Sequence, residues 1–121
     1  MGATPAVRRA AAIGGGVIGA GWAARFVLHG IDCSVYDPDP EIARKMGEVL
    51  ANARRALGLL FPGALPPEGR LHIAASLAEA VAGADFIQES LPEREDLKQR
   101  IYASIEEAAP ATTLIASSML A

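Results

Sequence analysis

Residues 10–21 read AAAIGGGVIGAG, a short apolar run followed by a glycine-rich turn and the start of an amphipathic stretch. In this pattern Gly14 permits a tight turn out of a strand, and Gly16 lets the backbone approach a bound group. Gly19 lets the following helix lie close to the strand. A pyrophosphate is favoured at the N-terminus of such a helix, where free N–H groups and the positive end of the helix dipole attract an anion.

An acidic residue lies at the matching distance. A second apolar run ends at Asp37, 23 positions after Gly14, where dinucleotide-binding folds place the acid that binds the 2′-hydroxyl of the adenosine ribose. Glycines can also simply make a turn, but that interpretation leaves the strand, the helix and the acid as coincidences. We expect NAD to be bound by Asp37 and by the loop residues Gly14, Gly15, Gly16, Val17, Ile18 and Gly19.

The residues after Asp37 predict NAD rather than NADP. A 2′-phosphate would meet the Asp37 carboxylate, and residues 38–41, PDPE, add two acids and no base. Arg44 and Lys45 are close in sequence, but we expect them to face solvent from the following helix.

Hydrophobic periodicity alternates between strands and helices along the chain. Apolar runs predict five strands, at residues 7–13, 31–36, 71–74, 85–89 and 112–117. Apolar residues three and four apart predict four helices, at residues 17–29, 41–60, 77–82 and 93–108. This alternation predicts an α/β fold, a Rossmann-type doubly wound parallel sheet in the strand order 3-2-1-4-5 with helices on both faces. We expect a loose N-terminal tail at residues 1–6 and one NAD-binding domain at residues 7–121.

The spacing also predicts which helix residues are buried. In the first helix we expect the inward side to hold Val17, Ile18, Ala24, Val27 and Leu28. In the second we expect it to hold Ile42, Met46, Val49, Leu50, Ala53, Leu57 and Leu60. Ser76, with Glu79 three residues later, predicts a capping box at the start of the third helix.

Composition excludes several classes of function. The 121 residues are 51% apolar and carry a net charge of −3, with no stripe of Lys and Arg interleaved with aromatics, so nucleic acid is not an expected partner. Arg8 and Arg9 precede an apolar run that is similar to a signal peptide, but its glycines and Arg25 argue against a signal helix or a membrane span. We therefore expect a cytoplasmic protein with no membrane partner.

Residues suited to other chemistry do not form a recognisable site. Cys33 is the only cysteine, and we expect it to pack in the core. His29 and His72 stand near no carboxylate that would form a catalytic dyad, and the acids around Asp37 lack the pattern of a calcium loop. We predict no catalytic residue and no metal ligand within the chain.

Two segments carry a resemblance to a known family. Residues 13–41 read IGGGVIGAGWAARFVLHGIDCSVYDPDPE, and residues 84–118 read ADFIQESLPEREDLKQRIYASIEEAAPATTLIASS. Both resemble the N-terminal NAD-binding domain of the 3-hydroxyacyl-CoA dehydrogenase family. The stretches WAARF, at residues 22–26, and QESLPER, at residues 88–94, are most similar to its carnitine 3-dehydrogenase branch.

The resemblance implies further site residues. A glutamate and a lysine that line the nicotinamide side of NAD in the family fall on Glu93 and Lys98. The position of the family's substrate-contacting serine falls on Leu120, which has no hydroxyl. In the family, the catalytic His and its Glu partner lie in a segment beyond the part that corresponds to these 121 residues, as does the helical domain that closes over the substrate and forms the homodimer.

Two functions follow from these residues. The first is the NAD-binding half of an oxidoreductase that oxidises the 3-hydroxy group of carnitine or an acyl-CoA by hydride transfer to NAD. The second is a stand-alone NAD(H)-binding module without chemistry, which Leu120 favours. The extent of the resemblance favours the first, and we expect residues 1–121 alone to be inactive.

Overall fold

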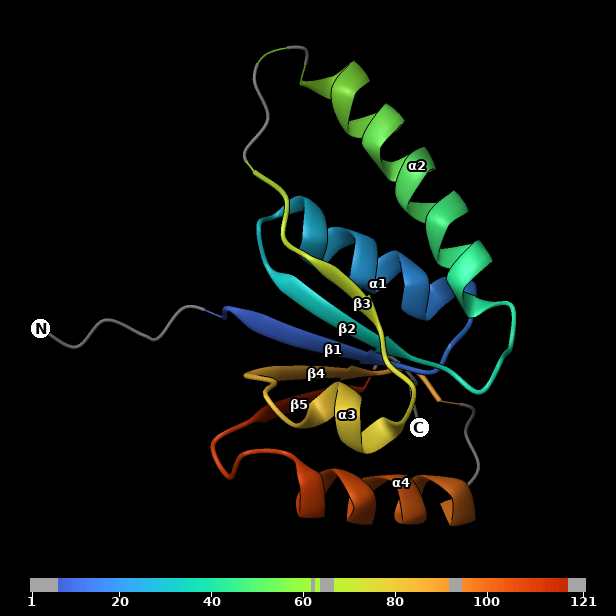
Figure 1. Cartoon of the computed structure of the whole chain (residues 1–121), viewed down its shortest axis with the longest axis vertical. Helices are drawn as coiled ribbons and strands as arrows, with labels where there is room; N and C mark the ends of the chain where they lie inside the picture. Colours follow the sequence, from blue (N-terminus) through green and yellow to red (C-terminus); the bar gives the residue numbers. More distant parts are fainter. Residues whose placement is uncertain (1–6, 62, 64–66, 92–94, 118–121) are drawn as a thin grey trace, which may run out of the picture.

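The computed structural model describes residues 7–61, 63, 67–91 and 95–117, which form a five-stranded parallel sheet with helices on both faces (Figure 1). The strands are β1 (Arg9–Ile13), β2 (Asp32–Tyr36), β3 (Leu71–Ile73), β4 (Phe86–Glu89) and β5 (Leu114–Ser117). The helices are α1 (Val17–Leu28), α2 (Ile42–Leu60), α3 (Leu77–Val81) and α4 (Glu95–Ala108). The sheet order β3-β2-β1-β4-β5 confirms the predicted fold, and the expected tail at residues 1–6 lies outside the described residues.

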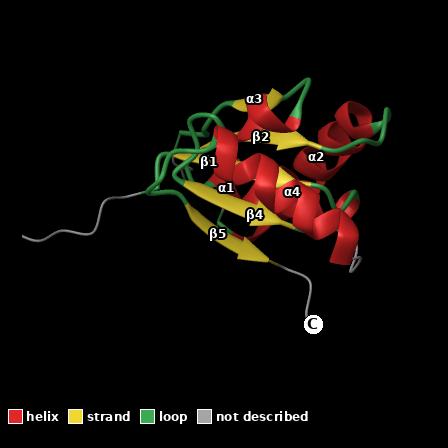
Figure 2. Ribbon diagram, turned by 90° about the horizontal axis from the view of Figure 1, so that it is seen from below, coloured by secondary structure: helices red, strands yellow, loops and turns green. Residues whose placement is uncertain are grey.

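β1 lies in the centre of the sheet and is buried on both faces. Because successive strand residues point to opposite faces, Ala10 and Ala12 pack on the side of α1 and α2. Ala11 and Ile13 pack on the side of α3 and α4. β1 pairs with β2 on one side and with β4 on the other, and Figure 2 shows β5 beside β4 at the edge of the sheet. Burial on both faces explains why β1 is a continuous apolar run rather than an alternating one.

The buried face of α1 differs from the one predicted. Small residues and one valine face the sheet, and Val17 and Ile18 are instead 63% and 62% exposed. Successive residues of an α-helix are rotated by about 100° around its axis. Val17 therefore lies at the border of the buried face, and Ile18 lies on the opposite side of the helix. Gly19 fixes this rotation, because a Cβ atom there would overlap the carbonyl oxygen of Gly14. The buried residues are Gly19, Ala20, Ala23, Ala24 and Val27.

α2 extends beyond the sheet that it covers (Figure 1). Ile42, Met46 and Leu50 are buried as predicted, but Leu60 is 73% exposed, and its predicted burial is wrong. The 19 residues of α2 span about 28 Å, whereas the five residues of β2 span only about 17 Å. Within the described ranges, no helix combines the length and the apolar character needed to cross a bilayer.

The other predicted features of the scaffold are close to what the structure shows. The described element boundaries agree with the predicted ones to within two residues, and the predicted start of the fourth helix at residues 93–94 lies outside the described residues. At α3 the Ser76 hydroxyl accepts the Glu79 N–H at 3.1 Å, as in a capping box. The Glu79 carboxylate accepts the N–H of Ala75 at 2.6 Å, and this bond is the first cause that holds the pKa of Glu79 below its usual value.

The contact at Gly19 predicts the effect of adding one methyl group. Gly19→Ala should lower the free energy of unfolding by about 1–3 kcal/mol, because α1 or the loop must move to relieve the overlap with Gly14. The measurement is urea unfolding followed by circular dichroism. Gly21→Ala is the matched control, since a Cβ at Gly21 meets nothing within 4 Å and should stabilise the helix by up to ~1 kcal/mol. Equal stability of the two variants would contradict the proposed contact.

Candidate functional site

The glycine loop between β1 and α1 has a backbone conformation that requires glycine. Gly14, Gly15 and Gly16 have φ angles of 71°, 85° and 52°. These values lie in the left-handed region that L side chains rarely adopt. The Gly14 N–H donates to the carbonyl of Tyr36 at 2.8 Å, which ties the loop to the end of β2. A Cβ at Gly16 would meet nothing within 4 Å, so the space beside this residue is open to a ligand.

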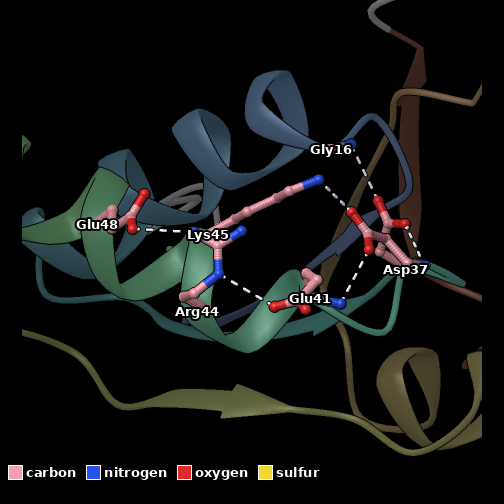
Figure 3. Close-up of polar contacts among 7 residues, drawn as sticks. Gly16, Asp37, Glu41, Arg44, Lys45 and Glu48 are labelled. Carbon is pink, nitrogen blue, oxygen red and sulfur yellow. Dashed lines mark hydrogen bonds and ion pairs between the residues drawn. The ribbon is translucent and has the colours of Figure 1, made fainter.

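Asp37 lies against this loop. Its Oδ2 accepts the N–H of Gly16 at 3.0 Å, and its Oδ1 accepts the N–H of Asp39 at 2.9 Å (Figure 3). The two parts of the predicted motif, 21 residues apart in sequence, therefore meet in space. Asp37 is placed there because β2 pairs in parallel with β1, so both strands end at the same edge of the sheet.

A cleft of about 570 Å³ opens beside Asp37 and the loop. This size is within the range of small-molecule sites. The cleft lies at the carboxyl ends of the strands, between the connections that leave β1 and β4 toward opposite faces, where doubly wound sheets bind ligands. It is lined by Gly14, Gly15, Gly16, Tyr36, Asp37, Pro38, Ser90, Leu91, Leu97 and Ile101.

A second cavity, of about 300 Å³, lies near the amino ends of β1 and β2. Three of its polar side chains, those of Asp32, His72 and Glu79, have partners within the protein. The Asp32 carboxylate accepts the N–H of Arg70 at 2.8 Å. The Nε2 of His72 lies 3.2 Å from Oε1 of Glu79, so the expectation that His72 stands near no carboxylate is wrong, and the two exposed side chains form a surface pair. This edge has no topological switch, so we assign the site to the larger cleft.

Lys98 points to a buried carboxylate at the end of β4. Its Nζ lies 3.6 Å from Oε1 of Glu89, which is fully buried, while Lys98 itself is 18% exposed. The Tyr102 hydroxyl donates to the same Oε1 at 2.9 Å, and the Leu91 N–H donates to Oε2 at 2.5 Å. Burial, and secondly the bond to Glu89, raise the pKa of Tyr102. Glu93, the other residue predicted for the nicotinamide side, lies outside the described residues, as does Leu120.

Sequence reasoning missed Glu89 and Tyr102, which form the buried contacts beside Lys98 at the end of β4. A usable signal was present, because Glu89 ends a strand at the ligand-binding edge and Lys98 and Tyr102 are four residues apart on one face of α4. Val17 and Ile18, both predicted to contact NAD, lie in the first turn of α1 and expose their apolar side chains there.

The side chains of Arg44 and Lys45, the two bases that follow Asp37, point in different directions (Figure 3). Arg44 is 56% exposed and pairs with Glu41 and Glu48, each at 3.0 Å, as expected for a residue that faces solvent. Lys45 turns back toward the loop, and its Nζ lies 2.5 Å from Oδ2 of Asp39. The prediction that Lys45 faces solvent is therefore wrong. This hydrogen bond is the first cause that holds the pKa of Asp39 below its usual value.

Comparison with known sequences identifies the family. The family described as "3-hydroxyacyl-CoA dehydrogenase, NAD binding domain" matches residues 9–120. The chain belongs to this family. It is 60% identical over 112 residues to the L-carnitine dehydrogenase of Mesorhizobium japonicum, covering 93% of this chain and 31% of that protein. It is 62% identical over 109 residues to the L-carnitine dehydrogenase/betainyl-CoA thioesterase of Ruegeria pomeroyi, covering 90% and 22%.

Solved structures of dehydrogenases have the same fold. The NAD⁺-dependent 5-formyl-3-hydroxy-2-methylpyridine 4-carboxylic acid 5-dehydrogenase matches with a TM-score of 0.80 and 31% identity, over 94% of this chain and 37% of that one. The 3-hydroxybutyryl-CoA dehydrogenase of Escherichia coli K12 matches with a TM-score of 0.75 and 26% identity, over 95% and 25%. The chain thus corresponds to the NAD-binding domain of this family and spans about a third of the length of its Mesorhizobium relative.

The buried contact between Tyr102 and Glu89 can be tested by removing one oxygen atom. Tyr102→Phe should cost about 1–3 kcal/mol in unfolding free energy, because a buried carboxylate loses a donor. Ser104→Ala, on the same helix, removes an exposed bond to the carbonyl of Arg100 and should change stability by less than ~0.5 kcal/mol. Chemical denaturation of both variants makes the comparison. A Tyr102→Phe chain as stable as the control would show that this contact does not stabilise the site.

Proposed function

We propose that this domain binds NAD in the 570 Å³ cleft for a dehydrogenase that oxidises the 3-hydroxyl group of carnitine. The substrate is supported by the 60% identity to an L-carnitine dehydrogenase. The main support for NAD binding in this cleft is the 3.0 Å hydrogen bond that the Gly16 N–H donates to Asp37. This bond brings an anion-binding loop and a ribose-binding acid to one edge of the same cleft.

The loop has the properties that a pyrophosphate requires. Its backbone is open at Gly16, so that an oxygen can approach the main chain. α1 begins directly after it at Val17, and the first turn of α1 contains no acidic residue that would repel an anion. We propose that residues 14–19 hold the pyrophosphate and that Val17 and Ile18 offer apolar contacts to the cofactor from that turn.

We assign the two ends of the cofactor to different strands. Asp37, at the end of β2, accepts hydrogen bonds from the adenosine ribose. Lys98, beside the end of β4, and Glu93 line the nicotinamide side, as the resemblance to the family implies. Bound NAD supplies the acceptor for the hydride that leaves carbon 3 of the substrate. The residues of this chain hold the cofactor and orient it, and within residues 1–121 we assign none of them as the base.

The remaining parts of the proposal concern the longer enzyme. In the family, a His paired with a Glu takes the hydroxyl proton, and a helical domain closes over the substrate and forms the homodimer. We propose the same arrangement for the polypeptide that contains this chain, with a small 3-hydroxy compound as substrate and a cytoplasmic location. The length of the relatives supports a longer enzyme, because the chain spans only 31% of the Mesorhizobium protein.

A second candidate function is an NAD(H)-binding module without chemistry. It is favoured by Leu120, which stands where the family has a substrate-contacting serine. The two functions differ in one measurement, the formation of NADH from NAD and carnitine by the longest polypeptide that the gene encodes. Turnover supports the dehydrogenase, and tight NAD binding without turnover supports the module.

Binding of NAD can be tested at the glycine loop. The chain should bind NADH at micromolar to millimolar concentration in calorimetry, and Gly16→Val should abolish binding, because valine disfavours the φ of 52° and fills the space beside the loop. Gly47→Val is the control, since Gly47 is exposed on α2 with nothing within 4 Å of its Cβ position. If NADH binds the Gly16→Val and unmodified chains equally, the loop assignment is wrong.

Cofactor choice tests Asp37. The chain should prefer NAD over NADP by at least ~10-fold, or ~1.4 kcal/mol, because a 2′-phosphate would meet the Asp37 carboxylate. Asp37→Asn should reduce the preference, because it removes the charge that repels a 2′-phosphate and leaves a weaker acceptor for the ribose 2′-hydroxyl. Asp32→Asn removes the same charge at the opposite end of β2 and should leave the preference unchanged. Equal dissociation constants for both cofactors in the unmodified chain would place Asp37 away from the ribose.

A further inference from the structure

Lys45 is the one base that the structure brings to the turn after β2, among the described residues that contact Asp37 or Asp39. It lies in the first turn of α2, and its Nζ is 2.5 Å from Oδ2 of Asp39. The side chains are 35% and 26% exposed, so the pair is partly shielded from water. The other oxygen of Asp39 accepts the N–H of Glu41 at 2.9 Å, which fixes the carboxylate in the turn.

The pair is connected to the proposed cofactor site. The Asp39 N–H donates to Oδ1 of Asp37 at 2.9 Å, and Oδ2 of Asp37 accepts the N–H of Gly16 at 3.0 Å. Together with the pair between Lys45 and Asp39, these bonds form a chain of contacts to the glycine loop, and Figure 3 shows Lys45 directed toward the side of the loop where Asp37 contacts Gly16. The ammonium group of Lys45 is therefore two side chains away from the loop.

A cation at this position has a specific consequence for dinucleotide binding. Rossmann domains that accept NADP place a basic side chain near the end of the second strand, where it neutralises the 2′-phosphate. Here a suitable base is present, but an acid holds it. Arg44, the other base nearby, is held in the same way by Glu41 and Glu48.

We propose that Asp39 is a second determinant of cofactor specificity, which disfavours NADP by holding Lys45 in an ion pair and by adding its own negative charge. This proposal rests on the assignment of Asp37 to the adenosine ribose. Asp37 acts directly at the 2′ position, where it binds the hydroxyl of NAD and repels the phosphate of NADP. Asp39 acts only on the 2′-phosphate of NADP, through its own charge and through Lys45. The two aspartates have separable effects, because Asp37 acts on the affinity for both cofactors and Asp39 acts mainly on the affinity for NADP.

The Asp39→Asn variant distinguishes the effect of Asp39 from that of Asp37. Asparagine has the same shape and keeps an oxygen for the Glu41 N–H, but it loses the charge that holds Lys45. The dissociation constant for NADP should fall about tenfold, since one repulsive charge is removed and one cation is freed. The dissociation constant for NAD should change less than about twofold, because Asp37 keeps its contacts. Both are measured by calorimetry on the 121-residue chain.

Two control variants identify the cause. Glu68→Gln removes one charge from the ion pair with Arg54, which lies outside the turn after β2, and should leave both dissociation constants unchanged. Asp39→Asn combined with Lys45→Gln should lose most of the gain in NADP affinity, because the freed cation is gone. The inference is overturned if Asp39→Asn leaves NADP affinity unchanged while NAD still binds, or if the double variant keeps the whole gain. Failure of the unmodified chain to bind NAD would instead overturn the proposed function itself.

Discussion

The close approach of α1 to the glycine loop sets the geometry on which the site depends. Gly19 lies so near the carbonyl of Gly14 that no side chain fits between them. The rest of the interface is built to match, with alanines along β1 and on the buried face of α1. Larger residues would push the helix outward, and its N-terminus would move away from the loop. Small residues in the core therefore serve the site, because they hold the positive end of a helix dipole where an anion is to bind.

Topology then determines which side chains reach the cleft. β1 pairs with β2 and β4, whose connections cover opposite faces of the sheet, so the residues after both strands meet beside the loop. Asp37 follows β2 and contacts Gly16. Ser90 follows β4, and its N–H donates to the carbonyl of Ile13 at 2.9 Å. Parallel pairing alone brings these separated parts of the sequence to one edge.

The sequence predicted the features that local patterns control. The glycine loop, the strand order and the contact region of Asp37 follow from spacing and from the rules for parallel sheets. The wrong predictions concern side chains whose environment is set by tertiary contacts. Ile18 fits an apolar pattern, but the contact at Gly19 rotates it away from the sheet. The position of Lys45 in the sequence is typical of an exposed helix residue, but its ammonium group forms an ion pair with Asp39 instead of extending into solvent. Glu89 was missed because its partners Lys98 and Tyr102 lie on α4, so the strand end and the pair on the helix identify the contact only when they are considered together.

The hydrogen bonds of Asp37 explain why recognition at this edge involves more than one acid. Its carboxylate accepts the N–H of Gly16, a residue whose φ of 52° lies in a region that few residues tolerate. The side chain that we assign to the ribose therefore also stabilises the conformation of the loop. A substitution of Asp37 thus affects both the contact with the ribose and the loop that we assign to the pyrophosphate. Among the described residues, the hydrogen bonds of Asp39 reach the loop through Asp37. A charge at Asp39 can thus adjust which cofactor is accepted without disturbing the loop that binds the part common to both.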